Sequence, residues 1–257
     1  ETRALRARRL QYVKTLADAV PPRIKPNEYH LFLSHVWGTG QDQMRIVKTR
    51  MLEMMPDSQV FLDVDDLEDI SDLEGYIDRT HLVLIYCSQG YFQSKNCMRE
   101  IRSSVRKGKR LLPIIDPEKP KGGLTREEIE QQLIEADASY AKWGFDDDGP
   151  RGKELYTKLF AEEPIEWNRL GVFQDVSMRL VAERMLPQDH GEVSVMNEVA
   201  QEMGKFSIPT PRNGRRYHLY ISPFNLGGAA FVDEVNKRLS SNIRYTTDVG
   251  ELHVAER

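Results

Sequence analysis

Residues 81–88 have the sequence HLVLIYCS, in which six apolar side chains follow one another without a charged residue between them. A continuous apolar run of this length is typical of a strand that is buried on both faces, as in a parallel sheet covered by helices on either side. The stretch therefore predicts a central strand of an α/β fold. The segments on both sides of it are then expected to alternate between helix and strand.

Segments with the composition of strands and of helices do alternate around this run. Further strands are predicted at 29–34 (YHLFLS), 59–64 (QVFLDV), 110–116 (RLLPIID) and, as a short edge strand, within 163–170 (EPIEWNRL). Helices are predicted between them at 42–55, 73–77, 94–107, 124–144 and 173–186. The first has apolar residues at helical spacing, Met44, Val47, Met51 and Met54, and the fourth opens with the capping-box pattern of Thr125 and Glu128. Alternation at this spacing implies a parallel sheet with helices on both faces, and ligands of such sheets bind beyond the carboxyl ends of the strands.

The composition excludes several classes of protein. The chain has 257 residues, 40% of them hydrophobic and 30% charged, with a formal net charge of -4. No global field therefore attracts nucleic acid or an anionic membrane. The two cysteines, Cys87 and Cys97, are too few for a disulfide framework and favour a reducing, cytoplasmic setting. No apolar run reaches the roughly 20 residues of a membrane helix, so no membrane contact is expected within this chain.

The segments outside the central alternation predict flanking helices and a repeat. An N-terminal amphipathic helix is predicted within 1–26, and because it starts in mid-pattern the chain is expected to be a fragment of a longer protein. A helix followed by a linker is predicted at 187–213. The segment YHLYISPFNLGG at 217–228 echoes YHLFLSHVWGTG at 29–40, which predicts that 214–257 is the incomplete start of a second, related module.

The ordered set of motifs over 27–186 resembles the Toll/interleukin-1 receptor (TIR) domain family. YHLFLSH is similar to the first conserved box, VFLDVDDLEDISDLEGYI occupies the place of the second strand and the BB loop, and IEWNRL resembles the tryptophan-containing box. Residues 94–100 (SKNCMRE) match the Ser-x-x-Cys-x-x-Glu stretch of plant and NAD-cleaving members. The resemblance implies a flavodoxin-like five-stranded parallel sheet, self-association, a signalling role and, in some members, NAD+ cleavage by the glutamate that is here Glu100.

The chemistry that the resemblance implies needs one carboxylate and no metal or cofactor, with NAD+ as the substrate. Nicotinamide is a cationic group that leaves as a neutral molecule, so no general acid is required, and positive charge develops on the ribose ring. A placed carboxylate stabilises that charge. Ser94 is expected to cap a helix that buries Cys97 and Ile101, which places Glu100 at the rim of the crevice. The alternative is a surface glutamate paired with Arg99 or Arg102.

Candidate substrate-binding residues surround that crevice. They are Ser34, His35, Trp37, Gly38, Asp65, Tyr91, Ser94, Asn96 and Cys97. Gly38 is expected in a flexible loop, and His35 is either a phosphate or ribose ligand or a structural loop histidine. Asn96 stands where plant members have tryptophan, and Trp37, Tyr91 or Phe92 is either a replacement stacking surface or simple packing.

An acidic and a basic segment form the candidate interface. The interface residues are Asp65, Asp66, Glu68, Asp69, Arg102 and Arg106. Acidic loop against basic helix would give a head-to-tail homo-oligomer, whereas the alternatives for the basic helix are a solvated face or nucleic-acid binding. The acidic run is not a calcium loop, because Leu67 replaces a ligand and Glu68 replaces the required glycine. No metal site is predicted.

The sequence therefore predicts a TIR-type NAD+ glycohydrolase that is activated by self-association, with other TIR domains as partners. The alternative from a different class is a non-catalytic scaffold that mediates homotypic protein–protein interaction. A module that binds a nucleotide without turnover would use the same crevice.

Overall fold

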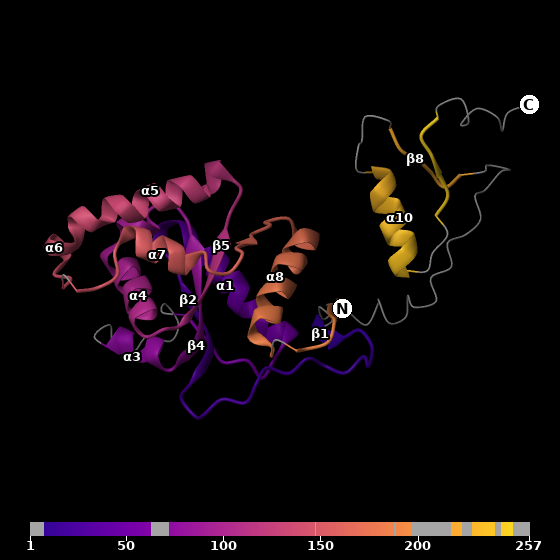
Figure 1. Cartoon of the computed structure of the whole chain (residues 1–257). Helices are drawn as coiled ribbons and strands as arrows, with labels where there is room; N and C mark the ends of the chain where they lie inside the picture. The colour runs from indigo at the N-terminus through magenta and orange to yellow at the C-terminus, as the bar shows by residue number, and fades with distance from the viewer. Residues whose placement is uncertain are drawn as a thin grey trace, which may run out of the picture. The chain divides into compact units, whose positions relative to one another are not determined.

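A computed structural model of the chain describes residues 8–62, 72–146, 148–187, 189–196, 217–222, 228–239 and 243–248 (Figure 1). The chain divides into two compact units, Glu1–Asn197 and Glu198–Arg257, and each is described here by itself.

The first unit is built on a five-stranded sheet in which every pairing is parallel. Its strands are β2 (Tyr29–Ser34), β3 (Val60–Phe61), β4 (Thr80–Cys87), β5 (Arg110–Ile115) and β6 (Ile165–Glu166). They lie in the order β3-β2-β4-β5-β6. With the strands numbered from one within this sheet, the order is 2-1-3-4-5, which is that of the flavodoxin-like fold. The predicted fold class is confirmed, and β6 is an edge strand as expected.

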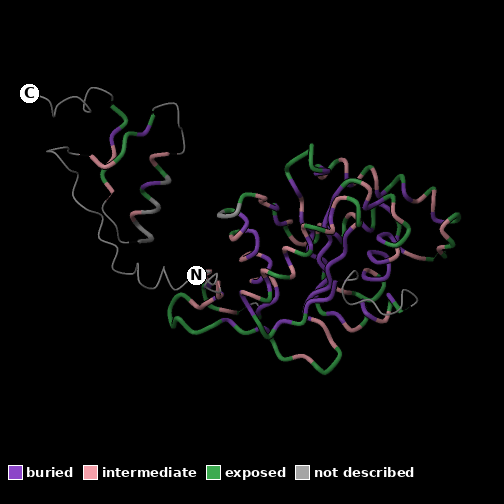
Figure 2. The backbone as a smooth tube through the Cα atoms, turned by 180° about the vertical axis from the view of Figure 1, so that it is seen from behind, coloured by how far each residue is buried: buried purple, intermediate pink, exposed green. Residues whose placement is uncertain are grey.

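Helices cover both faces of this sheet. Helices α1 (Trp37–Met54) and α8 (Gly171–Met185) cover one face, and α3 (Leu73–Asp78), α4 (Lys95–Arg106), α5 (Arg126–Ala136) and α7 (Gly152–Leu159) cover the other. Side chains alternate between the faces, so that Leu31 and Leu33 belong to one core and Phe32 to the other. The strands are buried throughout their centres (Figure 2). None of the helices in the described ranges is long and apolar enough to cross a membrane.

Two of the predicted helices form for the reasons expected, and one helix was missed. The side chains of α1 predicted to face the core, Met44, Val47, Met51 and Met54, are all buried. Helix α5 begins with the predicted capping box between Thr125 and Glu128. Helix α7 was not predicted, and short helix α6 (Tyr140–Trp143) precedes it. A Cβ at position 152 would lie 2.7 Å from the Ile134 Cα, so α7 approaches α5 closely only because Gly152 has no side chain.

The predicted N-terminal helix is wrong over its described part. Residues Arg9–Tyr12 form strand β1, which pairs antiparallel with β7 (Val193–Met196) and places Leu10 opposite Val195. Beyond β1 the chain turns back on itself, since the amide of Tyr12 donates to the Ala17 carbonyl at 2.9 Å. Leu10 is fully buried in the core shared with α1, so strand pairing and burial override the helical spacing of the apolar residues.

The predicted helix within 187–213 is also wrong where it is described. Val193–Met196 is a strand, consistent with the β-branched side chains of Val193 and Val195. Both β1 and β7 pack against the domain, and the first unit therefore extends to Asn197 instead of ending at residue 186.

The second unit contains a parallel β-α-β element, made of β8 (Leu219–Tyr220), α10 (Gly228–Leu239) and β9 (Tyr245–Thr246). Its register repeats that of β2 and β3, with Leu219 beside Tyr245 as Leu31 lies beside Val60. A histidine makes the same contact in both places. The Gln59 amide donates to His30 Nδ1 at 2.9 Å, and the Arg244 amide to His218 Nδ1 at 2.9 Å. That 214–257 begins a second module of the first unit's family stays a prediction.

Candidate active site

The candidate active site lies at the carboxyl edge of the sheet, where the strand order reverses between β2 and β4. Ser34 is the last residue of β2, and Tyr91 opens the short 3-10 helix η2 (Tyr91–Gln93) that follows β4. Glu100 lies in the second turn of α4. The topology thus brings three residues from distant parts of the sequence to the position where doubly wound sheets bind their ligands.

A chain of hydrogen bonds joins these three side chains. The Ser34 hydroxyl donates to Glu100 Oε2, and Ser34 Oγ lies 2.5 Å from the Tyr91 hydroxyl oxygen. A serine hydroxyl has one proton, which is directed here to the carboxylate, so Tyr91 is the donor in the second bond. The arrangement fixes one carboxylate oxygen of Glu100 by a hydroxyl that is itself held in place.

The three residues are deeply buried. Ser34 is 1% exposed, Tyr91 0% and Glu100 5%. Burial, with smaller effects from the charges of Cys97 and Glu100, raises the pKa of the Tyr91 hydroxyl well above its ordinary value. Tyr91 therefore remains a hydrogen-bond donor at neutral pH. The expected position of Glu100 at a rim is wrong: α4 turns it inward, because the hydroxyl of Ser34 supplies a polar partner beneath the helix.

The predicted cap of α4 forms as expected. Ser94 is the N-cap, and its Oγ accepts a hydrogen bond from the Cys97 amide at 3.4 Å. The thiol of Cys97 is buried and donates to the His35 carbonyl at 3.3 Å, which ties α4 to the end of β2. His35 is also buried, and its Nδ1 lies 3.3 Å from the Leu33 carbonyl. These contacts hold the segments that carry Ser34 and Glu100 against each other.

The remaining predicted substrate-binding residues lie farther from this cluster or are exposed. Trp37 and Gly38 form the first turn of α1, so the flexible loop expected at Gly38 is wrong. Trp37 is 63% exposed, and Asn96 is exposed on the first turn of α4. Asp65 lies outside the described residues.

A second polar cluster at the same edge of the sheet was not predicted. Asp116 follows β5 directly and is fully buried, where it accepts hydrogen bonds from the Tyr86 hydroxyl at 2.8 Å and from Arg169 Nε at 2.7 Å. Its other carboxylate oxygen accepts from the Glu118 amide at 2.8 Å. Both oxygens are therefore occupied by structural partners that join β4, β5 and the segment after β6. A terminal aspartate in RLLPIID is the sequence signal for this cluster.

Of the candidate interface residues, the structure describes only the two arginines, and these differ in exposure. Asp65, Asp66, Glu68 and Asp69 lie outside the described residues. Arg102 was expected on an exposed basic face but is 5% exposed, because its guanidinium lies over the rings of Tyr140 and Phe145 at 4.5 and 4.6 Å and donates to backbone carbonyls. Arg106 is exposed and forms an ion pair with Asp146.

Comparison with known proteins finds no matching family model and no matching curated protein. Among solved structures, the chain is similar to the TIR domains of the activated Roq1 resistosome that directly recognises the pathogen effector XopQ. The TM-score is 0.46 and the identity 15%, over 62% of this chain and 100% of that one. It is also similar to the TIR domain of the Toll-related receptor TRR-2 from Hydra magnipapillata. Here the TM-score is 0.30 and the identity 12%, over 34% of this chain and 70% of that one. By its own sheet order, the first unit of the chain is a flavodoxin-like α/β domain.

Proposed function

We propose that this chain is a TIR-type NAD+ glycohydrolase that acts in signalling and is switched on by self-association, with Glu100 as its essential carboxylate. The single observation that carries the proposal is the position of Glu100: a buried carboxylate, held by Ser34, at the switch point of a flavodoxin-like sheet. A carboxylate held at such a position is a candidate for binding and chemistry, because burying its charge is costly unless a function or a partner requires it.

The reaction places modest demands on the site. The bond between ribose C1′ and the nicotinamide nitrogen breaks, and its electron pair returns to the pyridinium ring, which leaves as neutral nicotinamide. A water oxygen then bonds to C1′, one proton goes to solvent, and ADP-ribose is formed. Positive charge develops on the ribose between these events, and the negative charge of Glu100 stabilises it. That stabilisation is greater in a buried site than in water.

The burial of Glu100 supports a requirement for activation. At 5% exposure the carboxylate has too little open surface to contact a ribose ring, so α4 or its neighbours must shift before substrate can reach it. Self-association is the expected source of that shift, because an interface that binds the open arrangement better than the closed one increases the open population. The proposed partners are accordingly other TIR domains, including further copies of this chain.

Nicotinamide release tests the proposal. The purified chain is incubated with NAD+ in dilute solution and, separately, tethered at high density on lipid vesicles, and nicotinamide is quantified by liquid chromatography. Release is expected on the vesicles and is expected to fall at least 100-fold in both Glu100→Gln and Glu100→Ala. Glu154→Gln serves as the matched control, because Glu154 is an exposed carboxylate on α7, on the same face of the sheet as α4. Release that is unaffected by both Glu100 substitutions would remove Glu100 from the mechanism.

A non-catalytic TIR scaffold is the second candidate, favoured by an apolar stripe on α8 and the residue before it. Leu170, Phe173 and Val176 are 69%, 58% and 45% exposed and recur every three residues, so they share one side of the helix. Such a stripe fits a homotypic contact. Concentration-dependent light scattering without nicotinamide release on the vesicles would decide for the scaffold.

A further inference from the structure

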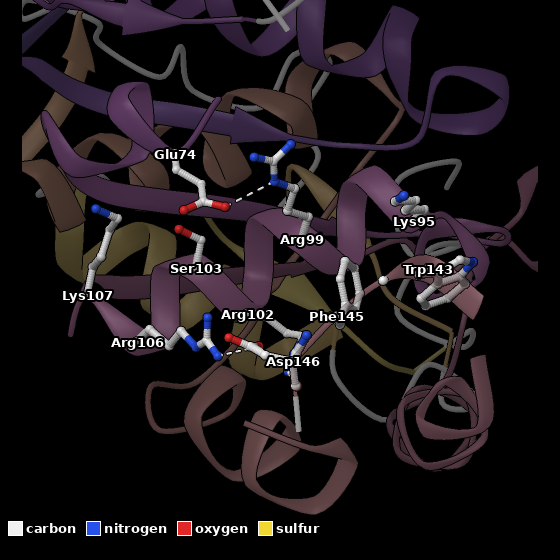
Figure 3. Close-up of a pocket in the computed structure, with 11 residues that line it drawn as sticks. Glu74, Lys95, Arg99, Arg102, Ser103, Arg106, Lys107, Trp143, Phe145 and Asp146 are labelled. Carbon is white, nitrogen blue, oxygen red and sulfur yellow. Dashed lines mark hydrogen bonds and ion pairs between the residues drawn. The ribbon is translucent and has the colours of Figure 1, made fainter. Parts of the chain in front are cut away.

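A concave pocket of about 390 Å³ lies against α4, and its lining includes neither Glu100 nor Ser34 nor Tyr91. It is bounded by α4, by Glu74 of α3 and by the segment from Trp143 to Asp146 (Figure 3). A pocket of this volume is in the range that binds small molecules. It is therefore separate from the candidate active site, although both use the same helix.

The lining of this pocket is strongly basic. Five cationic side chains face two carboxylates, and the cations are Lys95, Arg99, Arg102, Arg106 and Lys107. Lys95 and Arg106 are eleven residues apart on α4, which corresponds to about 16 Å along the helix axis. Charge spread over that length suits a ligand with more than one anionic group better than it suits a single small anion.

Two arginines of the pocket, Arg99 and Arg106, are each paired with an exposed carboxylate. Arg99 Nε donates to Glu74 at 3.0 Å and Arg106 forms an ion pair with Asp146, and these two carboxylates are 51% and 57% exposed. Ion pairs with partners this exposed contribute little to stability, so an incoming anion displaces them at small cost. Guanidinium groups match the oxygens of a phosphate in a bidentate geometry, which favours phosphate as that anion.

A buried hydroxyl on the same helix points to a ligand independently of the charges. Ser103 lines the pocket at 6% exposure, and its Oγ has no hydrogen-bond partner in the described part of the chain. The neighbouring Ser104 shows the usual arrangement, in which its hydroxyl donates to the Glu100 carbonyl at 2.8 Å. Buried hydroxyls without partners are uncommon in native proteins. Ser103 lies between Arg99 and Arg106 on the helix, where it can donate to the same anion.

The other end of the pocket is aromatic. Trp143 lines the pocket together with Lys95 (Figure 3), and its ring centroid is 5.6 Å from that of Phe145. The Phe145 ring is fixed by the Arg102 guanidinium, which lies 4.6 Å from its centroid. Aromatic side chains beside cations are the arrangement on which nucleobases stack. We propose that this pocket binds a nucleoside diphosphate, with the base at Trp143 and the phosphates between Arg99, Ser103 and Arg106.

Calorimetric titration of ADP into the whole chain tests the proposal, with pyrophosphate and adenosine as the two partial ligands. ADP is expected to bind more tightly than either, and its affinity is expected to fall between 50 and 300 mM NaCl because phosphate contacts are screened by salt. The double variant Arg99→Gln/Arg106→Gln is expected to lose at least tenfold in ADP affinity. Its charge-matched control is Lys121→Gln/Lys153→Gln, which removes two exposed lysines outside the pocket and is expected to bind as the parent does.

Two single variants test the contact with the base and the contact with the phosphates separately. Trp143→Leu is expected to weaken ADP but to leave pyrophosphate within twofold of the parent. Ser103→Ala, which removes one hydroxyl without changing charge, is expected to weaken both by about tenfold or more, the usual effect of one hydrogen bond to a charged group. Loss of ADP binding on substitution of Glu100, with no loss on substitution of Arg99 and Arg106, would overturn the proposal. Equal losses of ADP affinity in the arginine and lysine double variants would overturn it as well. Absence of ADP binding at 1 mM would also overturn it.

Discussion

The β2-α1-β3 element of the first unit and the β8-α10-β9 element of the second have the same parallel strand–helix–strand arrangement, but their strands are buried to different extents. In each, the two strands are parallel, and a histidine Nδ1 accepts a hydrogen bond from the backbone amide of the residue just before the second strand. Leu31 and Phe32 of β2 are fully buried, whereas Leu219 and Tyr220 of β8 are 44% and 39% exposed. The local fold therefore arises from sequence in both places, but burial depends on the further strands and helices.

The difference extends to the candidate active site. Ser34 ends β2 as Ser222 follows β8 in the matching position of the echoed sequence. Ser34 is buried where η2 and α4 supply Tyr91 and Glu100 as its partners, while Ser222 is exposed. A serine after the first strand is thus not a site by itself. The described part of the second unit contains no strand or helix equivalent to β4 and α4.

The largest expected difference in the free energy of unfolding is between the alanine variants of Leu31 in β2 and Leu219 in β8. Leu31→Ala is expected to lower the free energy of unfolding of the first unit by about 2–5 kcal/mol, because it opens a cavity in a closed core. Leu219→Ala is expected to change the same transition by less than about 0.5 kcal/mol. All three tryptophans lie in the first unit, so their fluorescence during urea unfolding reports on that unit. Similar losses in both variants would mean that β8 belongs to the core of the first unit.

The two serines are expected to differ by a smaller amount. Ser34→Ala removes the buried hydroxyl that bonds both the Tyr91 hydroxyl and the Glu100 carboxylate, and is expected to cost about 1–3 kcal/mol. Ser222→Ala removes an exposed hydroxyl and is expected to be nearly neutral in the same urea experiment. Ser34→Ala with parental stability would show that the hydrogen-bond chain does not hold α4 in place.

The smallest expected effect is a pH dependence from His30. Burial lowers the pKa of His30 below its ordinary value of 6.5, against an opposing hydrogen bond to the Pro22 carbonyl. The unfolded chain therefore binds more protons than the folded chain as pH falls below about 6.5, and the stability that neutral His30 contributes above that pH is lost on acidification. The urea midpoint of the first unit is expected to fall less between pH 7.5 and 5.5 in His30→Asn than in the parent. Identical pH profiles would contradict this.

Much of the fold follows from local patterns in the sequence. The apolar run at 81–88, the methionine spacing of α1 and the capping box of α5 each depend on neighbouring residues only, and each was predicted. The strand β1 was not, because Leu10 is buried by a partner strand more than 180 residues away. The same limit applies to the site: the position of Glu100 on α4 was predictable, but its inward orientation depends on Ser34 and Tyr91, which only the sheet topology brings to it.

In the proposed function, the carboxylate held at the switch point of the first unit stabilises the charge that develops when NAD+ is cleaved. The most direct measurement is nicotinamide release by the vesicle-tethered chain carrying either Glu100→Gln or Ser222→Ala. Glu100→Gln is expected to reduce nicotinamide release at least 100-fold, whereas release by Ser222→Ala is expected to stay within twofold of the parent. Equal release by the parent and Glu100→Gln, or a comparable loss in Ser222→Ala, would contradict it.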